Sequence, residues 1–495
     1  MQDPIHSRTV AGRPPIAKTA IRRKTAVILP VVMLLLCLAV EGADSRPDPV
    51  QQRSRFRPTR FSPVAPVSAY AFAEEESSGE PIYGSEPSCC DEFGVPVEDS
   101  AYCGEDCGEG CGEDYYAGGE YWGDRVVAGP GFPCYRPLMP LCGRFEARGE
   151  YLLWWTQGSG VPPLVTTSPA GTQAEQAGVL GQETTTILFG GESLAESSRS
   201  GGRITMTYWL QPNRCTGIEA SYLGIGKQTS AFYADSDGDP ILARPFFNIR
   251  NGGDDEQDSL LVAFTTRAEG RVAADVTAEF QGVEVLLRWA MLQQDAHRMD
   301  VLVGYRFQRL DDGVSISQFT ESTELISQGT TIDLFDRFNS RNRFHGAELG
   351  VLYSERYCRW SLEMLMKVGF GNTHSRVSID GSTTTTVPEE PSVTTSGGLL
   401  ALPTNMGVYG DNRFTMIPEF GITVGYDLTQ RLRATFGYTF IYWSNVARAG
   451  DQIDLNVNDS QLSGGTLDGA PRPEFSWITT DFWAQGLNFG LDYRF

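Results

Sequence analysis

The feature that most constrains the fold is a set of ten segments in which apolar and polar residues alternate. In the first, FEARGEYLLWW, Tyr151, Leu153 and Trp155 share one face, and Arg148 and Glu150 share the other. Alternation with a period of two is the pattern of a β-strand with different surroundings on its two faces. The remaining segments, in chain order, are GRITMTYWL, GIEASYLG, GVEVLLRW, DVLVGYRF, GAELGVLY, WSLEMLMKVGF, PEFGITVGY, RLRATFGYTFIYW and AQGLNFGLDYRF.

The connections between these segments alternate between short and long. Short connections lie near residues 211–215, 292–298, 355–358 and 427–430, and long ones span about 158–202, 227–277, 311–341, 372–412 and 445–480. Short turns at one end and long loops at the other are typical of outer-membrane barrels, whose strands need about 9–11 residues to cross the bilayer. The sequence therefore predicts an all-β fold: a transmembrane, antiparallel, up-and-down β-barrel of about ten strands over residues 145–495. Twelve strands stay open, because TTTILFGG and VSIDGSTTTT could extend into the sheet.

The N-terminus predicts export. Basic residues 22–24 precede the apolar run of residues 25–40, and small residues near Gly42 and Ala43 suit cleavage, so residues 1–43 form the expected signal peptide. Two competing readings are less favoured. Cys37 lacks the small preceding residues of a lipoprotein signal, and Lys24 follows the paired arginines where a twin-arginine signal needs apolar residues.

Residues 44–144 are expected to form a disordered, acidic, cysteine-containing extension in the periplasm. Residues 74–124 contain sixteen acidic residues and no Lys or Arg, a composition that keeps a chain extended. Seven of the ten cysteines lie between residues 89 and 142, and both disulfides and a metal site are compatible with them. Their odd number makes disulfide-linked partners conceivable, and the oligomeric state stays open. The formal net charge of -22 argues against a nucleic-acid partner.

Strand parity predicts which side chains line the lumen and which meet the membrane interfaces. The expected lumen-lining residues are Arg148, Glu150, Glu219, Glu284, Arg306, Glu348, Glu363, Lys367, Glu419 and Arg433. Seven tryptophans near strand ends are expected to form aromatic girdles at the two interfaces, namely Trp154, Trp155, Trp209, Trp289, Trp360, Trp443 and Trp483. Charges enclosed in a lumen must pair with each other or with water.

Several motifs together resemble the beta-barrel-porin-7 family of outer-membrane proteins. They include EYLLWW, PPLVTTSP, ILARPFFN, LVGYRFQRL, NRFTMIPEFGITVGYDLT, YTFIYWSNVARAGDQID and TDFWAQGLNFGLDYRF, within residues 145–495. The resemblance implies an outer-membrane β-barrel surrounded by outer-membrane lipid. It also implies that the terminal aromatics Tyr493 and Phe495 form the signal that the outer-membrane assembly machinery reads.

Two further patterns were weighed as sites. Asp235, Asp237 and Asp239 alternate as calcium ligands do, but Pro240 stands where the EF-hand loop needs glycine, so calcium at this external loop is a weak expectation and no other cofactor is expected. Neither His374 nor the GGESLAES segment around Ser193 forms a recognisable catalytic motif. We therefore expect no enzyme.

A ten-stranded barrel leaves little room beyond its own side chains, since eight strands are already filled by them. We therefore expect a narrow or plugged porin-like channel for passive diffusion of small solutes. The alternative is a structural or surface-interaction barrel that acts through its long external loops and its cysteine-containing tail.

Overall fold

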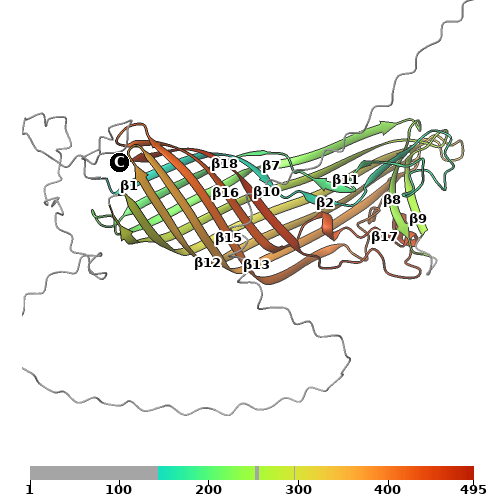
Figure 1. The fold of residues 1–495 in the computed structure, drawn as a ribbon. Coiled ribbons are helices and arrows are strands. Elements are labelled where there is room, and N and C mark those ends of the chain that lie inside the picture. Colours follow the sequence, from blue (N-terminus) through green and yellow to red (C-terminus); the bar gives the residue numbers. More distant parts are fainter. Residues whose placement is uncertain (1–142, 251–255, 295) are drawn as a thin grey trace, which may run out of the picture. The chain divides into compact units, whose positions relative to one another are not determined.

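The structure, a computed structural model, describes residues 143–250, 256–294 and 296–495, which are almost entirely β-structure (Figure 1). In this part of the chain, no helix is long and apolar enough to cross a membrane. The expected signal peptide, residues 1–43, and all of the expected extension 44–144 except its last two residues lie outside the described residues.

Ten antiparallel strands form one closed ring, as the alternating segments predict. Each strand pairs with its neighbours in the ring, and the last pairs with the first, where Leu487 lies opposite Leu153. The chain's C-terminal strand is therefore a paired wall of the barrel and leaves no open edge. The ring contains β1 (Phe145–Thr156), β6 (Arg199–Trp209), β7 (Thr216–Ser236), β10 (Ala268–Gln293), β11 (His297–Ser322), β12 (Thr331–Tyr357), β13 (Trp360–Thr386), β15 (Gly407–Asp427), β16 (Leu432–Val446) and β18 (Thr480–Arg494).

Side chains alternate between the outside and the inside of this ring. On β18, Phe489 and Leu491 are 44% and 53% exposed, whereas Asn488 and Asp492 are 1% and 6% exposed. The large apolar residues thus cover the outer wall and the polar residues face inward. This inverts the arrangement of a soluble protein and is the arrangement of a barrel in lipid.

The strands are longer than the bilayer requires, and this corrects the expected loop boundaries. β10 and β11 have 26 residues each, and β12 and β13 have 27 each. Much of the sequence expected as loop, including residues 311–322 and 372–386, continues the strands of the barrel (Figure 1). Those extensions stay paired because their inward side chains pack on a second core.

This second core is built by the long connections, which fold back against the inner wall. A small sheet pairs β3 (Val165–Ser168), β4 (Thr186–Phe189), β8 (Ile241–Asn248), β9 (Glu256–Ala263) and β17 (Asn456–Val457). Its apolar residues, such as Leu242 and Phe246, pack with inward residues of the wall, such as Val276 and Phe338. The long-loop end of the barrel is therefore filled by a packed plug. Shorter elements of the loops are β2 (Ser159–Val161), β5 (Glu192–Leu194), β14 (Val393–Ser396) and the 3-10 turns η2 (Gly450–Gln452) and η3 (Asp459–Gly464).

One carboxylate fixes residues 397–405 to the wall. Asp336 of β12 accepts hydrogen bonds from the backbone N–H groups of Leu399, Leu400 and Ala401 at 3.0, 3.0 and 2.8 Å. Its other oxygen lies 2.5 Å from the Arg244 guanidinium of β8, and both side chains are fully buried. A single group thus joins the wall, the small sheet and a loop.

A second contact fixes the loop after β16. Asn342 donates to the carbonyl of Ala447 at 2.8 Å, and the N–H of Ala447 donates back to Asn342 at 2.9 Å. Next to it, the buried Arg448 pairs with the buried Asp312 of β11. Burial raises the pKa of Asp312, and the nearby Arg448 partly opposes this rise.

The twelve-strand alternative does not hold in the described residues. The segment VSIDGSTTTT is the outer end of β13, and TTTILFGG contributes β4 to the small sheet of the plug.

Candidate functional site: the filled lumen

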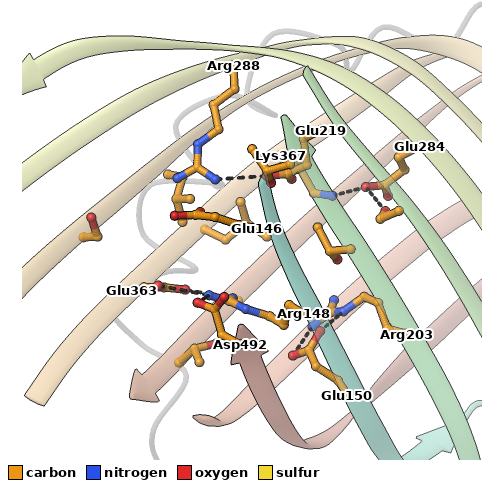
Figure 2. Close-up of a pocket in the computed structure, with 18 of the residues that line it drawn as sticks. Glu146, Arg148, Glu150, Arg203, Glu219, Glu284, Arg288, Glu363, Lys367 and Asp492 are labelled. Atoms are coloured by element: carbon orange, nitrogen blue, oxygen red, sulfur yellow. Dashed lines mark hydrogen bonds and ion pairs between the residues drawn. The ribbon is translucent and has the colours of Figure 1, made fainter. Parts of the chain in front are cut away.

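All ten residues expected in the lumen lie inside the barrel, in the half nearest the short turns (Figure 2). They occupy inward positions of neighbouring strands, so the register brings opposite charges face to face. Glu150 of β1, for example, lies directly opposite Arg203 of β6, and their side chains form a two-pronged contact that includes an Nη2–Oε1 distance of 3.0 Å.

The innermost group combines three carboxylates with two cations. The fully buried Arg306 guanidinium lies 3.0 Å from Glu284 and 2.9 Å from Glu348, and it also contacts Glu419. The Lys367 ammonium contacts Glu284 and lies 3.5 and 3.4 Å from Glu348 and Glu419. Because buried charges are tolerated only when paired, these five side chains depend on one another.

A second group lies closer to the short turns. Arg148 pairs with Glu363 at 2.9 Å and with Asp492 at 3.5 Å, and Arg433 lies 3.6 Å from the same Glu363 and 2.7 Å from Asp427 (Figure 2). This group joins β1 to four strands of the C-terminal half of the chain, namely β13, β15, β16 and β18. It ties the closing strands of the ring to each other through the lumen.

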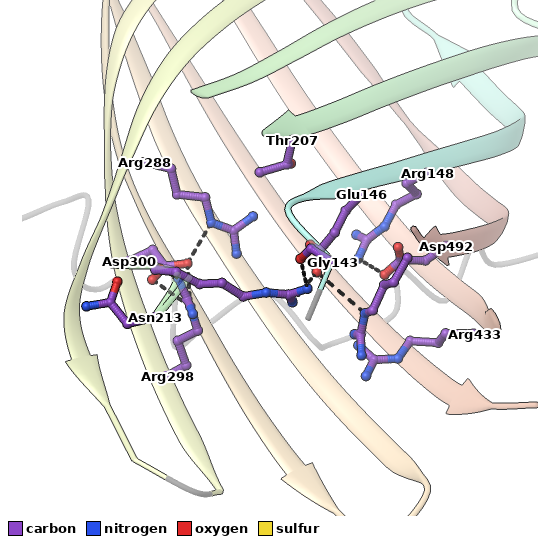
Figure 3. A network of polar contacts seen from close by, with 12 residues as sticks. Gly143, Glu146, Arg148, Thr207, Asn213, Arg288, Arg298, Asp300, Arg433 and Asp492 are labelled. Atoms are coloured by element: carbon purple, nitrogen blue, oxygen red, sulfur yellow. Dashed lines mark hydrogen bonds and ion pairs between the residues drawn. The ribbon is translucent and has the colours of Figure 1, made fainter. Parts of the chain in front are cut away.

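A third group of charged side chains lies next to the indole of Trp209. Arg288 bridges Glu219 at 3.0 Å and Asp300 at 2.6 Å, and Arg298 pairs with the same Asp300 at 2.8 Å (Figure 3). Both guanidiniums lie over the Trp209 ring, 5.0 and 4.5 Å from its centre. Trp209 thus supplies an aromatic face for two cations.

The short-turn mouth is closed by contacts that strand parity could not supply. Arg214, in the turn after β6, lies 2.6 Å from Glu146 and donates to the Gly143 carbonyl at 2.6 Å, and Arg494 lies 3.5 Å from Glu146 (Figure 3). Strand parity could not predict the position of Arg214, because a residue in a turn has no defined inward or outward face. Asp300, by contrast, lies on the same strand as Arg306 and six residues away, so strand parity places both side chains on the lumen side.

The space left between these groups is small. A polar cavity of about 150 Å³ remains among them. Ligand pockets are typically about 300–1,000 Å³. The lumen at this level therefore holds paired side chains and little else.

Above the charged groups, an apolar layer crosses the barrel. Phe280 of β10 lies 5.2 Å from Phe482 of β18 and 6.5 Å from Trp443 of β16, and Trp443 lies 6.4 Å from Phe344 of β12, ring centre to ring centre. All four rings are at most 1% exposed. The lumen is therefore filled in succession by ion pairs, by aromatic rings and by the loop plug.

The girdle expectation is wrong for three of the seven tryptophans. Trp154, Trp209 and Trp443 are 0–2% exposed because they point into the lumen. Trp154 donates a hydrogen bond to Asn488 at 2.8 Å, and Trp443 donates one to Thr373 at 3.1 Å. All three lie near strand ends, but at inward-facing positions of their strands. The structure places the other four, Trp155, Trp289, Trp360 and Trp483, on the outward face.

The expected calcium ligands are not brought together. Asp235, Asp237 and Asp239 are exposed at and beyond the end of β7. Among the described residues, the carboxylates that converge within 4.8 Å are Glu284, Glu348 and Glu419. Those are already neutralised by Arg306 and Lys367, so their arrangement is an ion-pair cluster. Calcium at the external loop stays a prediction.

His374 lies on the outside of the wall, as does His345. Nδ1 of His345 is 2.6 Å from the Tyr305 hydroxyl, and Nδ1 of His374 is 3.0 Å from the side-chain amide oxygen of Asn412. Ser193 lies exposed in β5.

The two terminal aromatics form a small cluster at the barrel seam. The Phe495 ring centre lies 4.7 Å from that of Tyr493 and 5.1 Å from that of Phe145, and the Phe495 N–H donates to the Phe145 carbonyl at 3.0 Å. Both terminal rings stay partly exposed, at 37% for Tyr493 and 58% for Phe495. Their role as an assembly signal stays a prediction.

The family of beta barrel porin-7 (BBP7) proteins matches residues 147–495. The chain belongs to this family. This confirms the resemblance seen in the sequence motifs and supports an outer-membrane location. Among curated proteins, no sequence matches the chain significantly.

Solved outer-membrane barrels are similar only at a distance. The protease OmpT of Escherichia coli has 11% identity and a TM-score of 0.31, with 71% of this chain and 96% of OmpT covered. A FadL homologue of Pseudomonas aeruginosa has 8% identity and a TM-score of 0.22, with 71% and 90% covered. The toluene transporter TodX of P. putida has 7% identity and a TM-score of 0.17, also with 71% and 90% covered. None of these likenesses bears on this chain's activity.

Proposed function

We propose that this protein is a closed outer-membrane barrel that acts through its extracellular end as a surface-interaction barrel. The observation that carries the proposal is the continuous filling of the lumen. Arg306, Glu348, Phe280 and Phe344 are each 0% exposed, so these side chains are buried at both the charged level and the aromatic level. A passive channel needs a continuous aqueous path, and burial of side chains at two successive levels argues against such a path.

The extracellular end suits an interaction role because it is ordered and projecting. The strand extensions and the plug share one apolar core, which holds the tips of the hairpins on a rigid base. Leu325 and Ile326, at the turn between β11 and β12, are 91% and 97% exposed. These two neighbouring side chains give the hairpin tip a small apolar contact point.

The permeability of the barrel tests the closed state. Full-length mature protein in planar bilayers is expected to give no stable unitary conductance, and liposomes that contain it are expected not to swell in small sugars. A version that lacks residues 44–144 should behave in the same way, since the lumen is filled by the barrel itself. Large, steady conductance from either version would refute the proposal.

The surface role is tested on whole cells. Cells that display the barrel are expected to adhere to each other or to a surface more strongly than cells without it. Replacing Leu325 and Ile326 with serine should reduce the adhesion, while replacing the lipid-facing Val303 and Leu349 with alanine should not. Equal adhesion of all displaying cells would count against the hairpin tip.

A narrow channel for passive diffusion of small solutes is the second candidate. It is favoured by the polar cavity of about 150 Å³ and by the charged residues around it. In this case the plug would have to move, and brief, flickering conductance that lengthens when the plug is loosened would support it.

A further inference from the structure

The outer wall has a sharp polarity boundary on four neighbouring strands. The register aligns Val285, Tyr305, Ala347 and Phe370 in one row across β10, β11, β12 and β13, all pointing outward. Val285 and Tyr305 are 46% and 45% exposed. Exposed apolar rows of this kind face the hydrocarbon of the membrane.

Four residues further along each strand, toward the long loops, the same face becomes basic. The aligned residues there are Gln281, Arg309, Arg343 and His374. The distance along a strand is about 13 Å. This row therefore lies at the level of the lipid headgroups, on the side that is extracellular in outer-membrane barrels.

The next outward row adds two more arginines. It consists of Glu279, Asp311, Arg341 and Arg376. Arg309 thus faces Arg343 across one strand pair, and Arg341 faces Arg376 across the next. Like charges directly opposite each other destabilise a sheet. Two such pairs side by side call for an anion that compensates them.

The protein compensates only part of this charge. Asp311 pairs with Arg309 at 3.0 Å and with Arg341 at 3.2 Å. Within the described part of the chain, no ion pair is formed by Arg343 or Arg376, and both are exposed. Two guanidiniums are therefore left with their charge directed outward.

We propose that this arginine patch, defined as Arg309, Arg341, Arg343 and Arg376, binds the phosphate groups of an anionic outer-leaflet lipid. Guanidinium groups match phosphate oxygens with paired hydrogen bonds. A hollow of about 480 Å³ lies beside the patch and gives a headgroup room; its lining includes Arg341, Arg376 and Lys227 together with the carboxylates Glu279, Asp311 and Asp312. A protein with a formal charge of -22 is repelled overall by an anionic surface. The patch gives it a locally positive region that can attract anionic lipid headgroups.

The test measures lipid binding to the full-length mature barrel by native mass spectrometry. The probes are bisphosphorylated lipid A, the same lipid after removal of its phosphates, and inorganic phosphate. Binding of bisphosphorylated lipid A is expected to weaken about thirtyfold in the double variant Arg343→Gln/Arg376→Gln, since each of the two lost interfacial cations contributes about fivefold. The charge-preserving variant Arg343→Lys/Arg376→Lys should bind more weakly than the unmodified protein and more tightly than the Gln variant, because an ammonium keeps the charge but not the paired hydrogen bonds.

The matched control is Arg271→Gln/Arg337→Gln, which removes the same charge from the same outward face farther from the membrane. It should bind within about twofold of the unmodified protein. Equal binding by the patch variant and the control would overturn the proposal. Binding of dephosphorylated lipid A or of inorganic phosphate as tight as that of the intact lipid would overturn it as well. Heat-modifiable mobility on gels shows that each variant is folded.

Discussion

Removing the carboxylate of Asp336 should release the plug while leaving the barrel intact. In Asp336→Ala, the fully buried Arg244 loses its ion-pair partner, and the backbone N–H groups of Leu399, Leu400 and Ala401 lose their acceptor. Breaking a buried pair by removing one partner costs about 3–5 kcal/mol. The loop can move toward water and recover part of the lost hydrogen bonding, so we expect a local loss of about 4 kcal/mol.

Hydrogen exchange of residues 397–405 in lipid nanodiscs measures this loss directly. At ~1.4 kcal/mol per factor of ten, exchange of these amides should become about a thousandfold faster. Asp336→Asn should have a smaller effect, because an amide oxygen still accepts from the three N–H groups. The Asp336→Ala barrel should conduct no more than the unmodified protein, because the charged and aromatic levels still fill the lumen; conductance that appears only in this variant would favour the channel.

The control for this experiment is Asp411→Ala. Asp411 pairs with Arg413 at 2.6 Å, but both side chains are more than a third exposed, so the pair is worth at most about 1 kcal/mol. Exchange at residues 397–405 should not change in this variant. Unchanged exchange in Asp336→Ala would refute the reasoning, since it would mean that the plug is held without this contact.

Four further predictions concern the lumen, the girdle, pH and assembly. Arg306→Met should lower the free energy of unfolding in urea by about 3–5 kcal/mol, because three carboxylates lose their buried counter-charge. Trp154→Ala should cost about 3–5 kcal/mol and Trp155→Ala clearly less in the same assay, because only Trp154 is buried. Burial raises the pKa of Asp312, so this group's contribution to stability is present at low pH and is lost as the pH rises through its folded-state pKa. Hydrogen exchange of residues 447–452, corrected for the intrinsic exchange rate, should therefore become faster over that pH range. In Asp312→Asn, the corrected exchange rate should no longer depend on pH in this range. Deleting Phe495 should leave the chain unassembled in the periplasm, and a normal heat-modifiable barrel in the outer membrane would contradict the assembly role.

The charged lumen shows how far local pattern reaches. Strand parity is a local property, because successive side chains of a strand point to opposite sides. It was enough to place Glu284, Glu348 and Glu419 inside the barrel. Which cation pairs with which carboxylate depends on how the strands are staggered around the barrel, a property that no single strand shows. This stagger brings Lys367 of β13 into contact with Glu284 of β10.

The aromatic layer and the plug show where local pattern stops. Phe280 and Trp443 are 163 positions apart in the sequence, and no spacing rule relates them. The polar strand extensions resemble loop sequence because their outward face meets water, and only the packing of the long connections on their inward face makes them strands.

The sequence by itself determined the closed, antiparallel, ten-stranded barrel and the inward charges, because alternation and connection length are properties of neighbouring residues. Only the tertiary structure decided that ion pairs, aromatic rings and a loop plug fill the lumen, and that Trp154, Trp209 and Trp443 take part in this filling. The filling of the lumen depends on the volumes of side chains that pack against each other across the barrel. Which side chains pack together is set by the stagger of neighbouring strands and by the loops that fold back into the lumen.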